Sequence, residues 1–64
     1  QIAGYADPQN REEMIAEGIV ARLNERGLTA VETVNNARVH MKARRLLASD
    51  TPVDVADLEG LVEA

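Results

Sequence analysis

The side chains of this 64-residue sequence that could perform acid–base, nucleophilic or metal chemistry are few, and they lie apart along the chain. His40 is the only histidine and cysteine is absent, so neither a His/Cys zinc site nor a thiolate nucleophile can form. No serine or acid stands at a spacing from His40 that indicates a catalytic relay. We therefore expect no catalytic residue, and we interpret His40 as a surface or edge residue.

Paired carboxylates occur at Glu12–Glu13 and at Asp54–Asp57. Acids in the first turns of helices complement the helix dipole, which accounts for both pairs without a ligand. The segment from Asp50 to Glu59 lacks the alternating oxygen ligands and the central glycine of a calcium loop. The four glycines are isolated, so no phosphate-binding loop is present. We expect no metal site and no cofactor.

Charge segregation is the most informative feature. The net charge is −4, yet residues 37–48 carry four bases and no acid, and residues 49–64 carry five acids and no base. On a helix, the spacing of Arg38, Lys42 and Arg45 places them on one face. This face is either solvated, with loose pairing to acids nearby, or a contact for an anion such as nucleic acid or an acidic partner. The overall acidity argues against non-specific nucleic-acid binding.

The elements that would position these residues are predicted to be three helices. Asp7-Pro8 resembles an N-cap followed by a first-turn proline, and Gly27 resembles a C-cap, which predicts a helix over 8–26 after an arm of residues 1–7. Thr29 and Glu32 fit a capping box and predict a second helix over 30–48. The short connection favours an antiparallel hairpin of the two helices.

The second helix contains Asn35-Asn36, which favours turns over helix interiors. The alternative is therefore a break there, with a short helix over 29–34 and another from residue 37. That alternative resembles a helix-turn-helix whose recognition helix would be 37–48. Proline at position 52 and the acids after it predict a third, short helix over 52–63.

The apolar residues divide into two sets on these predicted helices. One set repeats at helical spacing and is expected to form the core: Ile15, Ile19, Leu23, Val34 and Met41. The other set lies on the opposite side of the second helix and on the third, and is expected to form an interface: Val39, Ala43, Leu46, Leu47, Leu58 and Leu61. A helix that is apolar on two sides packs between partners, so we expect association to complete this small core.

The sequence thus predicts a single all-α domain over 1–64, a helical hairpin plus a short C-terminal helix. We interpret it as a non-enzymatic interaction or assembly module, such as an oligomeric structural subunit or a docking domain. The alternatives are a helix-turn-helix or antitoxin-type DNA-binding regulator and a small accessory or inhibitor subunit of an enzyme. The expected partner is a protein, either a second copy or a larger assembly. No apolar run could span a membrane, and we expect a soluble protein, with the cytoplasm slightly favoured.

Overall fold

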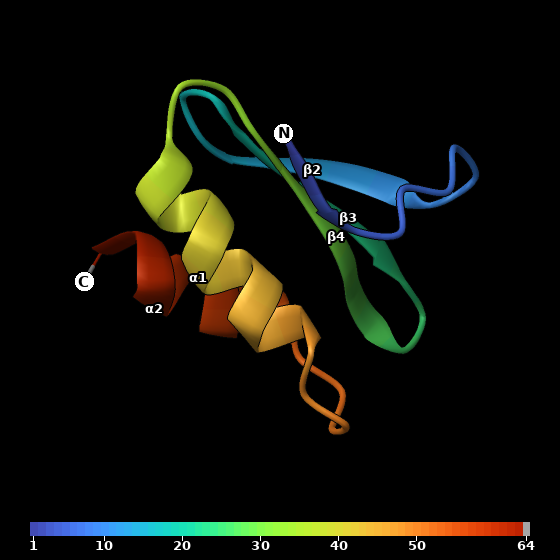
Figure 1. Ribbon diagram of the computed structural model, residues 1–64. Coiled ribbons are helices and arrows are strands. Elements are labelled where there is room, and N and C mark those ends of the chain that lie inside the picture. The colour runs from blue at the N-terminus through green and yellow to red at the C-terminus, as the bar shows by residue number, and fades with distance from the viewer. Residues whose placement is uncertain (64) are drawn as a thin grey trace.

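The computed structural model describes residues 1–63 and shows a four-stranded antiparallel sheet followed by two helices (Figure 1). The strand order across the sheet is β1-β4-β3-β2. Both helices lie on the same face of the sheet, which is an α+β arrangement. The elements are β1 (Ile2–Gly4), β2 (Arg11–Ala16), β3 (Ile19–Asn24), β4 (Gly27–Thr33), α1 (Ala37–Leu47) and α2 (Val55–Glu63).

The predicted all-α fold is therefore wrong, because residues 8–34 form a loop and three strands in place of a long helix and its hairpin partner. Ile19 and Leu23 share a face at a spacing of four residues, but four is also an even number, so they share a face on a strand as well. Ala21 between them is fully buried on that same face, as the strand period of two requires. Residues 1–63 form neither a helical bundle nor a helix-turn-helix, since residues 27–33 are a strand.

The residues interpreted as helix caps perform other tasks. The Asp7 side chain accepts a hydrogen bond from the Gln9 N–H at 2.9 Å, and this turn leads into β2. Gly27, interpreted as a C-cap, is the first residue of β4 and has φ +125°, a conformation that glycine adopts readily. Thr29 and Glu32, the expected capping box, belong to β4.

The C-terminal half of the chain follows the alternative that breaks at the two asparagines. Asn35 has φ +54°, and the side chain of Asn36 caps α1 by accepting a hydrogen bond from the Val39 N–H at 3.1 Å. The helix predicted from residue 37 is therefore present as α1. The helix predicted over 52–63 is present as the shorter α2. The arm predicted over 1–7 contains β1, which pairs with β4.

The core lies between the sheet and the helices. Its sheet half comes from alternate residues of the strands, such as Ala21 and Val31, and its helix half from Val39, Ala43 and Leu58. Leu58 is fully buried and is the buried residue of α2. No helix within residues 1–63 is both long enough and apolar enough to cross a membrane.

Candidate docking surface

The outer side of α1 gathers most of the chain's positive charge. The helix carries Arg38, Lys42, Arg44 and Arg45 and no acid, while the whole chain has seven bases and eleven acids. The three arginines are exposed and Lys42 is half-buried. Met41 lies among them and is 46% exposed. We call Arg38, Met41, Lys42, Arg44 and Arg45 the α1 basic face.

A shallow groove separates the α1 basic face from α2. It has a volume of about 420 Å³ and is lined by Lys42, Arg45, Leu46 and Leu61. Within residues 1–63, neither Lys42 nor Arg45 forms an ion pair. The groove therefore offers two cationic side chains beside two half-buried leucines, an arrangement suited to an acidic chain with apolar side chains.

The three residues predicted to contact an anion lie on one face of α1, as their spacing predicts. They are Arg38, Lys42 and Arg45. The six residues predicted to form an interface are divided differently. Three of them belong to the hydrophobic core and are at most 1% exposed: Val39, Ala43 and Leu58. The other three are half-buried: Leu46, Leu47 and Leu61. The reason is that the sheet covers the side of α1 that the predicted hairpin left open.

The five residues predicted to form the core are also divided. Ile19 and Leu23 are buried on the helix-covered face of the sheet, and Ile15 is half-buried at a bulge in β2. Val34 is 70% exposed because it follows β4 on the opposite face, and Met41 is exposed because it lies on the outer side of α1. Both are therefore surface residues in this fold.

His40 is one of the buried residues of α1 and is 9% exposed. Its Nδ1 and the Oγ1 of buried Thr33 have no hydrogen-bond partner. Among the residues that the structure describes, no group of three His, Asp or Glu side chains could hold a metal ion. His40 is thus a buried residue of the helix–sheet packing, and its predicted surface or edge position is wrong.

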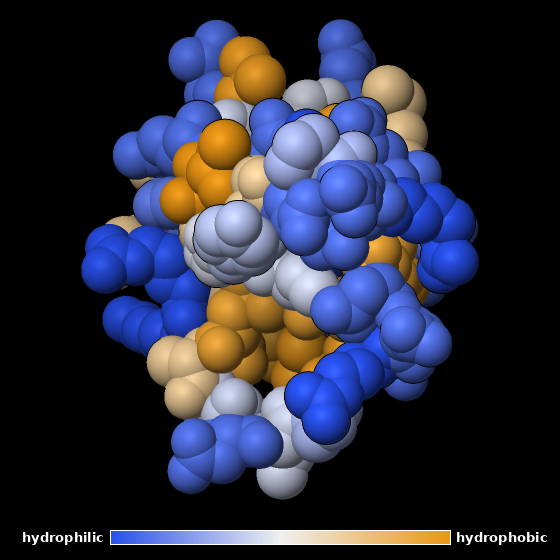
Figure 2. Space-filling model, turned by 90° about the vertical axis from the view of Figure 1, so that its right-hand side faces the viewer, coloured by the Kyte–Doolittle hydropathy of each residue, from blue (hydrophilic) through white to orange (hydrophobic). Residues whose placement is uncertain are grey.

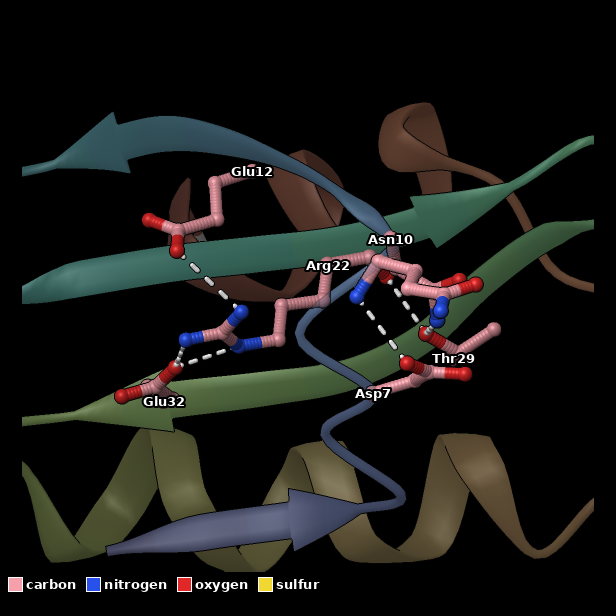
Figure 3. A network of polar contacts seen from close by, with 7 residues as sticks. Asp7, Asn10, Glu12, Arg22, Thr29 and Glu32 are labelled. Carbon is pink, nitrogen blue, oxygen red and sulfur yellow. Dashed lines mark hydrogen bonds and ion pairs between the residues drawn. The ribbon is translucent and has the colours of Figure 1, made fainter.

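The face of the sheet away from the helices carries a polar network that sequence reasoning missed (Figure 3). Arg22 on β3 lies between Glu12 on β2 and Glu32 on β4, with N–O distances of 3.1 and 2.5 Å. The hydrogen bond to Glu32, together with the charges of both carboxylates, raises the pKa of Arg22 above its ordinary value, and burial opposes this rise. Only the strand register reveals this triplet, because its members are ten residues apart in sequence.

A second part of the network fastens the β1–β2 loop to the sheet. The side chain of Asn10 donates to the Thr29 hydroxyl at 3.0 Å, and that hydroxyl donates to the Arg22 carbonyl at 3.1 Å. The Thr29 carbonyl accepts from the Tyr5 N–H. Thr29 lies where the register of β3 and β4 shifts, so a bulge provides the attachment point.

Figure 2 shows the molecule from the side away from the helices, with apolar areas separated by polar side chains in the upper part of the view. A hollow with an apolar floor lies in the lower part. A depression of about 470 Å³ lies between the β3–β4 turn and the loop before α2. Its lining is Asn24, Arg26, Leu28, Thr29, Ser49, Asp50, Thr51 and Pro52. It contains no predicted site residue.

Comparison with known proteins gives one result. A family model described as "Reductase C-terminal" matches residues 1–61, which is nearly the whole chain. No curated protein and no solved structure matched the chain.

Proposed function

The chain belongs to the reductase C-terminal family, and on this basis we propose that it is a non-catalytic docking domain of a larger reductase whose α1 basic face binds an acidic protein partner. The redox chemistry then belongs to the rest of the polypeptide. A docking role is one of the forms predicted for an interaction module, and the family description "Reductase C-terminal" supports it.

The observation that carries this proposal is the concentration of four cations on one helix of an acidic chain. A patch of one charge sign attracts a partner of the opposite sign and raises the association rate. Lys42 and Arg45 border the groove against Leu46 and Leu61, so an acidic partner gains apolar contact as well as charge contact.

A protein partner fits better than nucleic acid. The α2 helix and the loop before it carry five acids, which lie beside α1 in sequence and in space. A nucleic-acid backbone approaching α1 would meet these acids, and phosphate neutralisation dominates such binding. A folded acidic protein can place its carboxylates on α1 and direct other side chains at α2.

The test is a titration of the full-length reductase that carries this domain. The probes are poly-L-glutamate, as an acidic polypeptide, and a duplex DNA of random sequence. We expect poly-L-glutamate to bind, and the double variant Lys42→Glu/Arg45→Glu to weaken that binding by about tenfold, since each exposed contact contributes modestly. The matched control is Arg11→Glu/Arg26→Glu, which reverses two exposed arginines outside α1 and should leave the affinity unchanged.

Equal losses in the two double variants would show that only net charge matters, and would contradict a docking role for α1. Duplex DNA that binds more tightly than poly-L-glutamate, through the same two residues, would contradict the protein partner and favour the nucleic-acid alternative.

A further inference from the structure

A row of exposed apolar side chains crosses the sheet on the face opposite the helices. The strand register aligns Ile2, Glu32, Val20 and Met14 across all four strands. Ile2 is 51% exposed, Met14 is 74% exposed, and Val20 is half-buried between them. Val34 extends the row beyond β4 and is 70% exposed. We call Ile2, Met14, Val20 and Val34 the open-face row.

The charges beside the open-face row are partly compensated, because one arginine pairs with two carboxylates. Glu32 interrupts the row, but its carboxylate is bound by Arg22, which also pairs with Glu12. A partner that covers this face therefore meets apolar side chains and a paired ion cluster. This composition differs from the α1 basic face and resembles permanent interfaces, which are more apolar than transient ones.

Gln1 lies beside this row. The backbone nitrogen of Gln1 donates to the Thr33 carbonyl at 2.9 Å, and the Thr33 N–H donates to the Gln1 carbonyl at 2.9 Å. These bonds hold the start of β1 next to Val34, with Ile2 as the following residue. In a domain at the C-terminus of a reductase, the remaining polypeptide is joined at this corner of the sheet.

We infer that the preceding part of the same reductase polypeptide packs on the open face of the sheet and buries Ile2, Met14, Val20 and Val34. This inference rests on the proposed function, since it requires the chain to be a domain of a larger reductase. The two faces then have separate tasks. The open-face row joins the domain to its own reductase, and α1 on the other side of the sheet remains accessible to a partner.

A second copy of the domain fits this face less well. In a two-fold contact the same surface meets itself. The face, its β2 edge and the β2–β3 turn carry the acids Glu12, Glu13, Glu17 and Glu32 against the bases Arg11 and Arg22, so acids outnumber bases. Two such surfaces would repel each other. The covalently joined reductase has no such requirement for self-complementarity.

The two methionines of the domain provide the test, because one lies on each face. The full-length reductase is treated with hydrogen peroxide, and the oxidation rates of Met14 and Met41 are measured by peptide mass spectrometry, each relative to its rate in the urea-unfolded protein. In the structure of the domain alone, Met14 is the more exposed of the two. If the reductase covers the open face, we expect Met14 to oxidise about tenfold more slowly than Met41, since oxidation follows exposure.

A Met14 rate equal to or above that of Met41 would overturn the inference. Protection of Met14 that disappears on dilution would also overturn it, because the cover would then be a second copy. Protection that persists on dilution supports it. The proposed docking role is tested separately in the same samples, since addition of poly-L-glutamate should slow the oxidation of Met41 and leave Met14 unchanged.

A pair of variants adds a second readout. Met14→Glu places a charge in the covered row, and Met41→Glu places the same charge on α1. In the full-length reductase we expect Met14→Glu to accelerate proteolysis between the domain and the preceding polypeptide, and Met41→Glu to leave that rate unchanged. Equal proteolysis rates for the two variants would contradict the inference.

Discussion

At the residue scale, Arg22 shows how one side chain acquires a role that its sequence neighbours do not indicate. It lies between Ala21 and Leu23, both buried, and points to the other face of the sheet. Its side chain is 17% exposed and contacts two carboxylates on neighbouring strands. Cross-strand pairs of opposite charge stabilise sheets, so Arg22 fastens β2 to β4 across β3.

We predict that Glu32→Gln lowers the midpoint of urea unfolding more than Glu12→Gln does. Glu32 accepts the shorter contacts, and its side chain is 32% exposed against 59% for Glu12, so solvent screens its interaction less. Equal effects of the two substitutions would contradict this ranking.

The pH dependence follows from the raised pKa of Arg22. A group whose pKa is raised by folding stabilises the folded state below its unfolded pKa, and this contribution is lost only as the pH rises through the folded pKa. For an arginine both values lie in strongly alkaline solution. The titration of Arg22 should therefore add no pH dependence to the unfolding free energy near neutrality, which urea titrations at several neutral pH values would check.

At the element scale, α2 is held by a single fully buried side chain. The helix has nine residues, and Leu58 is its one buried residue. A helix this short does not persist in isolation, so its order depends on packing against the core, to which Leu58 contributes as a fully buried residue and Val55 and Val62 as partly buried ones. Because α2 also forms one wall of the groove, the same packing positions Leu61 opposite Lys42.

We predict that Leu58→Ala destabilises the domain by about 2–5 kcal/mol, the usual range for a buried leucine. Leu61→Ala is the matched control on the same helix, and because Leu61 is half-buried the loss should be less than half as large. Urea unfolding followed by circular dichroism measures both values. A loss for Leu61→Ala as large as that for Leu58→Ala would show that the groove residue, and not the core residue, holds α2.

At the scale of the whole molecule, the sheet and the C-terminal segment are joined at the β3–β4 turn. The Leu28 N–H donates to the Val53 carbonyl at 2.8 Å, a bond between segments that are 25 residues apart. The preceding residue, Gly27, has φ +125°, and a Cβ there would collide with that same carbonyl. The glycine therefore permits both the turn and the approach of the loop before α2.

We predict that Gly27→Ala destabilises the domain by at least about 2 kcal/mol, from backbone strain and the collision with Val53. Gly60→Ala is the control, because a Cβ at this helical position meets no atom within 4 Å, and it should stabilise the domain by up to about 1 kcal/mol. Thermal unfolding of the two variants provides the comparison. A Gly27→Ala variant as stable as the parent chain would contradict this role of the glycine.

The sequence by itself indicated the two C-terminal helices and the location of the basic charge, and it left open whether the first of them begins at residue 30 or at residue 37. Asn36 as a cap and the alternation of apolar and basic residues after it are local signals, and a helix from residue 37 satisfies them within its own length. The grouping of Arg38, Lys42 and Arg45 on one face follows from helical geometry alone. For this reason the grouping of these three cations could be predicted without knowledge of their neighbours, whereas Met41 beside them was expected in the core.

Only the tertiary structure decided the N-terminal half. The spacing of Ile19 and Leu23 fits a helix and a strand equally, and the choice depends on β4 and β2 being available to pair with β3. The placement of Val34 and Met14 on an open face, and of Arg22 between two glutamates, depends on strand register. Register joins residues that are distant along the chain, so these features follow from the packing of the whole sheet and not from any local pattern.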